Sequence, residues 1–301
     1  MKHLIVIGGA TATGKTALAI RLAQLYHTEI LSADSRQFFQ GMDIGTAKAS
    51  EAELAAVPHH FIDHLPITAA YSVGDFEREA LAVLHTIFQK HDVAILVGGS
   101  GLYLKAICEG LDTFPDVSAA TIAHVEKNEA EGGLPWMQQT LATLDPDYVK
   151  TVDLQNPARL RRALEVCLET GLPYSSFRKN TQVHRPFNPI YLLLDLPRPT
   201  LYARIDARVD LMIAQGLEAE ARTLLPYRDK SALKTVGYEE FFQYFDGDIS
   251  LADTISKIKQ HSRNYAKRQT TWFKKHGTWT VFHPEDFRKM MFFLKSSLEL
   301  K

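Results

Sequence analysis

Residues 4–16 read LIVIGGATATGKT, and this stretch decides the expected fold. Its first four residues form a continuous apolar run, which is typical of a short buried strand. A glycine-rich turn follows, and leucines at positions 18, 22 and 25 then repeat at helical spacing. Residues 9–16 match the P-loop pattern, and a strand before it and a helix after it are the context that this motif requires.

Such a loop binds phosphate because its backbone N–H groups surround the anion at the N-terminus of a helix. Lys15 adds a point charge, and the Thr16 hydroxyl is suited to a Mg²⁺ ion on the same phosphates, so Thr16 is the predicted metal ligand. A merely flexible glycine turn is the competing interpretation. The loop residues predicted to bind a diphosphate are Gly9, Ala10, Thr11, Ala12, Thr13, Gly14, Lys15 and Thr16.

Further short apolar runs alternate with helical patterns along the chain. They cover residues 30–32, 93–97, 191–194 and 279–282. Continuous short strands between helices predict a parallel sheet with helices on both faces.

Between about residues 114 and 189 the strand pattern is replaced by helical patterns. The clearest helix begins with Asn156 as N-cap and Pro157 at its first position, and it ends at Gly171. We therefore expect an α/β core made of residues 1–113 and 190–301, with a helical insertion at 114–189.

Composition excludes several classes of protein. The 301 residues are 46% hydrophobic and carry a net charge of −1, which is ordinary for a globular chain and names no partner. Two cysteines, Cys108 and Cys167, are too few for a disulfide framework or a Cys-x-x-Cys zinc site. No apolar run has the length of a membrane span. We expect a cytoplasmic protein without a membrane partner.

Positive charge is concentrated near the C-terminus. Residues 254–283 contain seven Lys or Arg and no acid. One predicted helix there carries a basic flank, which could neutralise several phosphates and favours a nucleic-acid partner; a solvated helix face is the alternative. The members of the basic flank are Lys259, Arg263, Lys267 and Lys274, beside an apolar stripe of Ile255, Ile258, Tyr265 and Trp272.

Two candidate catalytic residues follow predicted strands. Asp34 comes after the second strand, at the edge of an open α/β sheet where ligands bind, and is the candidate general base. A turn cap shared with Ser35 is its alternative role. Ser100 follows the third strand in a glycine-flanked turn, where a plain hydroxyl turn is the alternative. That turn has no Walker B carboxylate, which disfavours motor and switch ATPases.

A second group of candidates lies outside these motifs. Arg204 and Arg208 are one helical turn apart, which is unfavourable unless an anion such as phosphate lies between them. Neutralisation by Asp206 and Asp210 on a solvated face is the alternative. Residues 59–64 contain three histidines and an aspartate, but flanking prolines and the lack of soft ligands make packing or contacts at the phosphate edge the better interpretation than metal binding.

Several long motifs together resemble the tRNA dimethylallyltransferase family, also called tRNA isopentenyltransferases. The motifs are GGATATGKT at 8–16, SADSRQFFQGMDIGTAK at 32–48, PHHFID at 58–63, GGSGLYLKA at 98–106, QNPARLRRALEV at 155–166, TVGYEE at 235–240 and RNYAKRQTTWF at 263–273. The resemblance implies a P-loop kinase-like parallel sheet with a helical insertion that contacts tRNA. It also implies transfer of a dimethylallyl group from dimethylallyl diphosphate to the exocyclic amine of the adenosine 3′ of the anticodon.

The same resemblance assigns roles to residues. It implies that Asp34 takes the proton of the amine, with Ser100 and Lys15 also catalytic. The departing diphosphate would be held by residues 9–16 with Mg²⁺, and by Arg204 and Arg208. The residues implied to contact the anticodon loop of tRNA are Asp34, Ser35, Arg36, Gln37, Ser100, Gln155, Asn156, Pro157, Ala158, Arg159, Ser231, Ala232, Leu233, Lys234, Thr235 and Val236.

The chain departs from the family pattern at a few positions. Ala10 and Thr13 replace residues of the usual loop, Ser100 replaces a threonine, and Lys234 replaces an arginine. Ile122 and His124 stand where an arginine is often found, so one implied tRNA contact is in doubt.

Three other functions stay open at this point. They are a nucleoside or nucleotide kinase, prenyl transfer to free adenine nucleotides, and nucleic-acid binding without catalysis. We expect the chain to act as a monomer.

Overall fold

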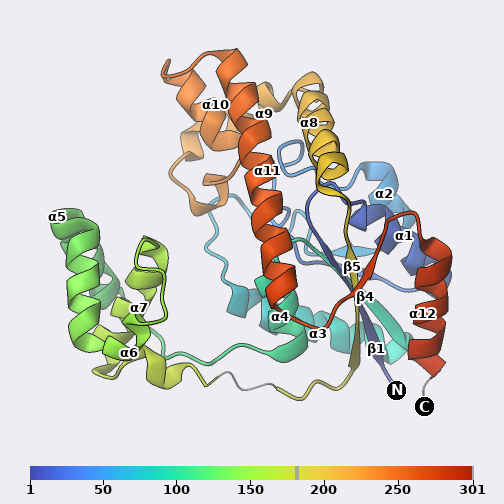
Figure 1. Cartoon of the computed structure of the whole chain (residues 1–301), viewed down its shortest axis with the longest axis horizontal. Helices are drawn as coiled ribbons and strands as arrows, with labels where there is room; N and C mark the ends of the chain where they lie inside the picture. Colours follow the sequence, from blue (N-terminus) through green and yellow to red (C-terminus); the bar gives the residue numbers. More distant parts are fainter. Residues whose placement is uncertain (180–182, 300–301) are drawn as a thin grey trace. The chain divides into compact units, whose positions relative to one another are not determined.

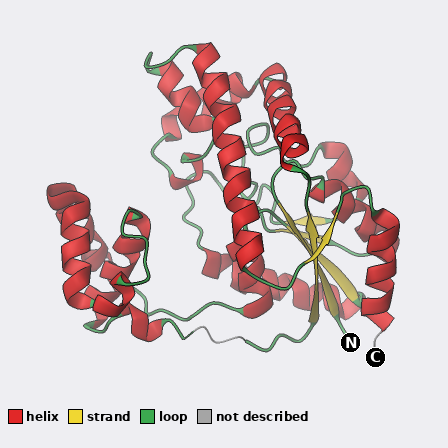
Figure 2. Ribbon diagram, in the orientation of Figure 1, coloured by secondary structure: helices red, strands yellow, loops and turns green. Residues whose placement is uncertain are grey.

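A six-stranded parallel sheet with the order β3-β2-β4-β1-β5-β6 organises the described part of the chain. The structure is a computed structural model that describes residues 1–179 and 183–299. Figures 1 and 2 show the sheet with helices packed around it. The strands are β1 His3–Gly9, β2 Ile30–Ser32, β3 His59–His60, β4 Val93–Val97, β5 Asn188–Leu194 and β6 Thr280–Phe282.

Both faces of the sheet are buried, as the continuous apolar strands predict. Leu4 and Val6 of β1 belong to one hydrophobic cluster, and Ile5 and Ile7 belong to a second one. This division follows from the strand geometry, in which successive side chains point to opposite faces. The prediction of an α/β protein with a parallel sheet covered by helices is confirmed.

Different helices contribute to the two clusters. α3, α4 and α11 pack into the first cluster, and α1 and α12 pack into the second. A fully buried Leu or Ile side chain contributes about 1.5–3 kcal/mol relative to an exposed one. The helices outside the insertion are α1 Lys15–Tyr26, α2 Glu51–Ala56, α3 Val73–Lys90, α4 Gly101–Glu109, α8 Arg198–Gln215, α9 Leu217–Leu224, α10 Tyr238–Phe245, α11 Leu251–Lys275 and α12 Phe287–Glu299.

The contact pattern divides the chain into two compact units. Unit 1 comprises Met1–Glu109 and His184–Lys301, and unit 2 comprises Gly110–Val183. The expected insertion, 114–189, has different limits, because Asn188 and Pro189 already belong to β5. Residues 180–182 of the expected insertion and 300–301 of the expected core lie outside the described residues.

Unit 2 has a helical core of its own. Its helices are α5 Ala119–Leu144, α6 Pro146–Val149 and α7 Pro157–Thr170. Asn156 caps α7 by accepting a hydrogen bond from the Arg159 amide, and Gly171 ends it in a left-handed conformation, as predicted. Leu141, Leu160 and Leu164 are among the buried residues that hold these helices together.

The central position of β1 places the glycine-rich loop between two neighbouring strand ends. β1 pairs with β4 on one side and β5 on the other, and Gly9 is in register with Leu194. All six strands are parallel, so their carboxyl ends meet at one edge of the sheet. The loop, Asp34 after β2 and Gly98 after β4 therefore share that edge.

The described helices give no sign of a membrane segment, since none is both long and apolar enough to cross a bilayer.

The helix predicted after the loop is confirmed as α1, and two details of the structure were not evident from the sequence patterns. Leu25 is 50% exposed, and α1 buries Leu18, Ala19, Leu22 and Ala23 instead. β3 was not predicted, because a strand of two residues gives no periodic signal.

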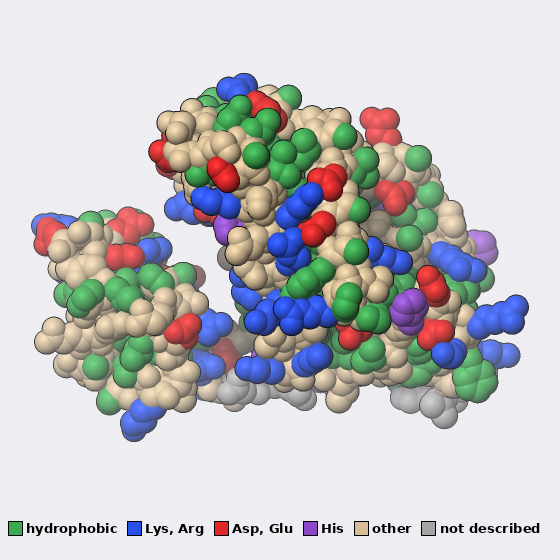
Figure 3. Space-filling model, turned by 45° about the horizontal axis from the view of Figure 1, so that its top comes forward, with side chains coloured by type: hydrophobic (Ala, Val, Ile, Leu, Met, Phe, Trp, Pro, Cys, Tyr) green, Lys and Arg blue, Asp and Glu red, His purple; other side chains and the backbone are tan. Residues whose placement is uncertain are grey.

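The basic flank of α11 is partly neutralised within unit 1. Lys259 pairs with Asp210 at 2.6 Å, and Arg263 pairs with Asp206 at 2.5 Å, both across the contact with α8. Lys267 and Lys274 are exposed and have no carboxylate partner in the described part of the chain. Figure 3 shows Lys and Arg side chains gathered on this face of unit 1.

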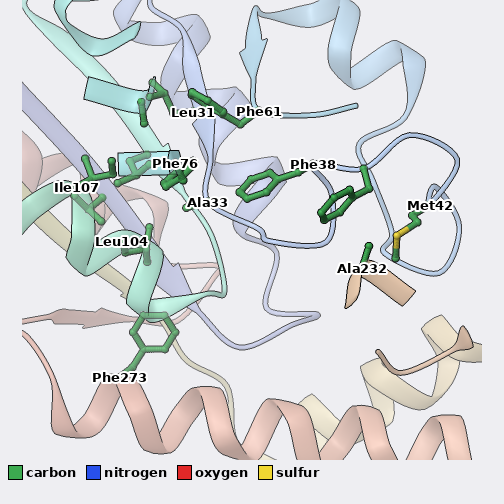
Figure 4. Packing of buried hydrophobic residues seen from close by; sticks show 14 of the residues in the cluster. Leu31, Ala33, Phe38, Met42, Phe61, Phe76, Leu104, Ile107, Ala232 and Phe273 are labelled. Carbon is green, nitrogen blue, oxygen red and sulfur yellow. The ribbon is translucent and has the colours of Figure 1, made fainter. Parts of the chain in front are cut away.

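The opposite side of α11 lies directly on glycine backbone. A Cβ atom at Gly8 would be 2.8 Å from the Phe273 ring and 2.9 Å from Trp279, and one at Gly101 would be 2.1 Å from Trp272. In Figure 4, Phe273 projects from α11 toward Leu104 of α4. The glycines therefore allow the helix to approach the strand ends this closely.

We expect Gly8→Ala to destabilise the protein by about 1–3 kcal/mol, because the added methyl overpacks the contact with Phe273 and Trp279. Urea unfolding followed by circular dichroism measures the change. Gly74→Ala, in the first turn of α3, is the control: it meets only the Ser72 hydroxyl at 3.7 Å and should be neutral or slightly stabilising. Equal unfolding midpoints for the two variants would contradict the packing argument.

Candidate functional site

A cavity at the carboxyl edge of the sheet collects most of the residues singled out from the sequence. It lies within unit 1, between the glycine-rich loop, the segments after β2 and β4, and helices α8 and α11. Its polar lining includes Thr11, Lys15, Thr16, Asp34, Arg36, Gln37, Thr46, Arg208, Thr235, Ser262, Tyr265 and Gln269. Its apolar lining includes Val97, Ile205, Val209, Met212, Leu217, Val236 and Ile258.

The backbone of the loop has the form that an anion site needs. Gly14 is the left-handed N-cap of α1, with φ 91°, and α1 has neither a capping side chain nor an acid in its first turn. The positive end of the helix dipole is therefore not neutralised by the protein. The loop also needs glycine at position 9 to keep this backbone conformation, because a Cβ atom there would lie 2.7 Å from the Leu194 carbonyl oxygen.

Two side chains brace the loop from inside. The Thr13 hydroxyl donates to the Ala10 carbonyl at 2.8 Å, and Lys15 Nζ donates to the same oxygen at 2.7 Å. Thr13 is fully buried, so its side chain is unavailable to a ligand and only its backbone can take part in binding.

Lys15 and Arg208 form a pair of cations around one carboxylate, Asp34. Burial lowers the pKa of Lys15 to about 8; Asp34 opposes the shift and Arg208 adds to it. Burial also lowers the pKa of Arg208, against the attraction of Asp34. Arg208 donates to the Thr11 hydroxyl at 3.0 Å. Two partly buried cations beside a single acid favour an anionic ligand.

Arg204 does not join this group. It is exposed and is absent from the cavity lining, although it precedes Arg208 by one helical turn. The alternative that Asp206 and Asp210 neutralise the two arginines is also wrong, because both acids pair with α11. The expected phosphate clamp therefore retains Arg208 alone.

Asp34 forms a turn of the kind considered for it and also lines the cavity. One carboxylate oxygen accepts the Arg36 amide at 3.1 Å, which closes a local turn. The side chain nevertheless lines the cavity together with Lys15 and Arg208. The turn bond fixes the direction of the carboxylate.

Ser100 lies beside the segment that carries Asp34. Its hydroxyl is 3.4 Å from the Ser35 hydroxyl and 3.5 Å from the Ser35 amide nitrogen. Tyr265 of α11, which the sequence assigned to a packing stripe, lines the cavity near Ser100. Burial, and secondarily Asp34, raise the pKa of Tyr265 to about 12. Tyr265 is therefore a neutral phenol at physiological pH.

Arg36 and Gln37 hold neighbouring segments in place. Arg36 donates to the carbonyls of Ser231, Ala232 and Lys234, at 2.8, 3.1 and 3.3 Å. Gln37 donates to the carbonyls of Thr46 and Ala47, at 3.1 and 3.2 Å. The side chains of both residues are thus already committed to backbone partners.

Only some side chains of the 231–236 segment are accessible to a ligand or to RNA. Ala232 and Leu233 are buried in the core, Ser231 and Lys234 are exposed, and Thr235 and Val236 line the cavity. An RNA contact through the side chains of Ala232 and Leu233 is therefore excluded in this conformation.

Glu220 is a site residue that the sequence did not reveal. Its carboxylate accepts the amides of Asp43, Ile44 and Gly45 and the Tyr238 hydroxyl, at distances from 2.7 to 3.1 Å. These bonds fix a loop that lines the cavity. No sequence signal marks this role, because three of the partners are backbone groups far away in the chain.

The remaining implied RNA contacts belong to unit 2. Residues 155–159 surround the N-terminus of α7, where Gln155 and Arg159 are exposed. His124 is exposed on α5, and Ile122 is half-buried.

The histidine-rich run forms no metal cluster. His60 Nε2 lies 2.6 Å from Glu29, His59 contacts the Val57 carbonyl, and His64 packs edge-on against Phe38 and Phe61. Residues 1–179 and 183–299 contain no group of three or more His, Cys, Asp or Glu placed to hold a metal. The contacts of His59, His60 and His64 are those of packed side chains.

Fold and site together define an α/β protein whose cavity combines an anion-binding loop, two cations and a carboxylate with apolar walls. The family model for IPP transferases matches residues 37–276. The chain therefore belongs to the IPP transferase family, as the sequence motifs indicated.

Individual relatives agree over nearly the whole chain. The chain is 53% identical to a tRNA dimethylallyltransferase of Christiangramia forsetii over 273 residues, covering 91% of this chain and 90% of that protein. It is 45% identical to a tRNA dimethylallyltransferase of Cytophaga hutchinsonii over 298 residues, covering 99% and 98%.

Solved structures share the fold. The full-length tRNA isopentenylpyrophosphate transferase from Bacillus halodurans has a TM-score of 0.74 at 33% identity, covering 99% of this chain and 97% of that one. A structure of a eukaryotic dimethylallyltransferase acting on tRNA has a TM-score of 0.80 at 26% identity, covering 96% and 75%.

We expect Arg208→Ala to weaken the binding of inorganic diphosphate about 10- to 100-fold, because a buried charge-assisted donor is lost. Arg204→Ala is the matched control on the same helix and should change the affinity less than about twofold, since an exposed charge is well screened. Isothermal titration calorimetry measures both. A larger loss for Arg204→Ala than for Arg208→Ala would refute the assignment of the clamp to Arg208.

Proposed function

We propose that this protein transfers the dimethylallyl group of dimethylallyl diphosphate to the exocyclic amine of the adenosine 3′ of the anticodon in tRNA, giving isopentenyladenosine. The proposal is carried by one observation: in a chain of the IPP transferase family, the cavity has a polar, charged lining on one part and an apolar lining on another. The loop, Lys15 and Arg208 suit a diphosphate. The walls formed by Val209, Met212 and Ile258 suit a short hydrocarbon.

The proposed reaction needs no covalent enzyme intermediate. The adenosine nitrogen attacks the first carbon of the dimethylallyl group, the carbon–oxygen bond breaks, and the electron pair leaves with the diphosphate. Lys15, Arg208 and the loop amides stabilise the charge that develops on the departing oxygen. Asp34 accepts the proton that the amine loses.

A magnesium ion fits the donor set beside the loop. Mg²⁺ prefers oxygen ligands and usually binds through one or two protein groups together with phosphates and water. The Thr16 hydroxyl and the Asp34 carboxylate line the cavity, and no cysteine or histidine does. Thr16 would hold the ion, with Asp34 close by; when bound, the ion neutralises part of the charge on the diphosphate.

The acceptor is proposed to be the anticodon loop of tRNA. The relatives named above are tRNA dimethylallyltransferases, and the exposed Lys267 and Lys274 provide unneutralised positive charge for a polyanion. The proposed contacts with tRNA are Ser100, residues 34–37, the accessible part of 231–236 and residues 155–159. Arg36 and Gln37 would act by fixing the segments that meet the RNA. The chain is proposed to act as a monomer.

The test is to incubate the protein and Mg²⁺ with dimethylallyl diphosphate and unmodified tRNA, with AMP and ATP as parallel substrates, followed by nucleoside mass analysis. We expect prenylated adenosine in the tRNA alone. Asp34→Asn, which is isosteric, should lower kcat about 10²- to 10⁴-fold and lower the affinity for tRNA far less. Prenylated AMP, phosphate transfer from ATP or no product would each contradict the proposal.

We expect kcat/KM for the donor to fall as the pH rises through about 8. The pKa of Lys15 is lowered to about 8 in the free protein, so above that pH Lys15 loses the positive charge that binds the diphosphate. Steady-state rates between about pH 6.5 and 9 measure the effect. Lys15→Arg keeps its charge throughout this range and should show no inflection near pH 8. The same inflection in both proteins would show that another group is responsible.

A further inference from the structure

A buried glutamine joins two loops of the cavity. Gln269 of α11 is 7% exposed. Its side-chain oxygen accepts the Thr11 amide at 2.9 Å, and its side-chain nitrogen donates to the Gly99 carbonyl at 3.0 Å. A buried primary amide is costly unless both ends are paired, and here both are.

The backbone around Gln269 is shaped to receive it. A Cβ atom at Gly99 would lie 2.3 Å from the side-chain nitrogen of Gln269. Only glycine at position 99 therefore leaves room for the bond from Gln269 to the Gly99 carbonyl itself. Gly99 and Gly101 thus serve the fit of α11, where they face Gln269 and Trp272.

The two residues bonded to Gln269, Thr11 and Gly99, lie near different reactants of the proposed reaction. Thr11 lies in the loop for the donor diphosphate, and its hydroxyl is also held by Arg208. Gly99 precedes Ser100, whose hydroxyl contacts Ser35, the residue after Asp34. Gln269 is therefore the direct link between the donor loop and the turn beside the proton acceptor.

The bond to Thr11 also separates Gln269 from ligand binding. The Thr11 amide is already committed to Gln269, so it is one loop amide that does not face a diphosphate. Gln269 lines the cavity, but its side-chain oxygen and nitrogen are each bonded to a backbone group, so its loss removes little direct binding of the donor. Its loss instead removes the two hydrogen bonds that hold the two loops at a fixed distance.

We propose that Gln269 is a positioning residue that sets the separation between the donor loop and the Ser100 turn. This inference rests on the proposed function. Attack on carbon requires reacting atoms about 3–3.5 Å apart and aligned, so a small relaxation lowers the rate more than the affinity.

The test compares steady-state kinetics and melting temperatures of Gln269→Leu and the wild type with dimethylallyl diphosphate and tRNA. Leucine preserves the bulk and removes both hydrogen bonds. We expect kcat per active site to fall about 10- to 100-fold, while KM for the donor changes less than about threefold.

A second variant checks the same contact from the other side. Gly99→Ala displaces the glutamine nitrogen and should reproduce the loss in kcat. The double variant should be little slower than either single one, because both changes remove the same link. Multiplied losses would mean that the two residues act independently and would overturn the inference.

Thr254→Val is the control for a merely structural role. Thr254 is buried on the same helix and loses a bond to the Ser250 carbonyl, far from both loops. It should lower the melting temperature and leave kcat unchanged. An active wild type with unchanged kcat in Gln269→Leu overturns this inference alone. A wild type that prenylates no tRNA overturns the proposed function and the inference with it.

Discussion

Helix α11 approaches the ends of β1 and β4 so closely that a side chain at Gly8, Gly99 or Gly101 would collide with Phe273, Gln269 or Trp272. This contact helps to bury one face of the sheet. It also makes α11 one wall of the cavity at the carboxyl ends of the strands. It also brings Tyr265 to Ser100 and Gln269 to the donor loop. A single helix therefore supplies core packing, cavity wall and polar links at once, and the glycine backbone is what permits it.

The electrostatics of the cavity depend on that enclosure. Water is excluded enough to lower the pKa values of both Lys15 and Arg208, and Asp34 balances only one of the two cations. An anionic ligand would relieve this imbalance, whereas an isolated apolar ligand would not. The apolar walls from α8 and α11 then suit the hydrocarbon part of the same ligand. The polar and apolar parts of the cavity thus favour a ligand that has both an anionic group and a hydrocarbon group.

Local patterns were sufficient for all the strands except β3, for the loop and for the α7 caps, because each depends on neighbouring residues. Contacts between distant segments were not predictable in the same way. Arg204 and Arg208 look equivalent on a helix, and only the tertiary packing of α8 exposes one and half-buries the other beside the cavity. Glu220 and Gln269 bind backbone groups, which carry no side-chain signature in the sequence. Tyr265 was read as packing because an apolar stripe and a cavity wall share the same periodicity.

The chain order of unit 1 has a consequence for how the protein is made. His3 of β1 pairs with Asn188 of β5, and unit 2 is encoded between them as one continuous stretch with its own core. On the ribosome, unit 2 emerges and can form local contacts before β5 exists, while β1 has only β4 as a neighbour. Parallel pairing between strands so far apart in the chain carries a large loop-closure entropy. The glycine-rich loop therefore acquires its final surroundings only after α11 has been synthesised.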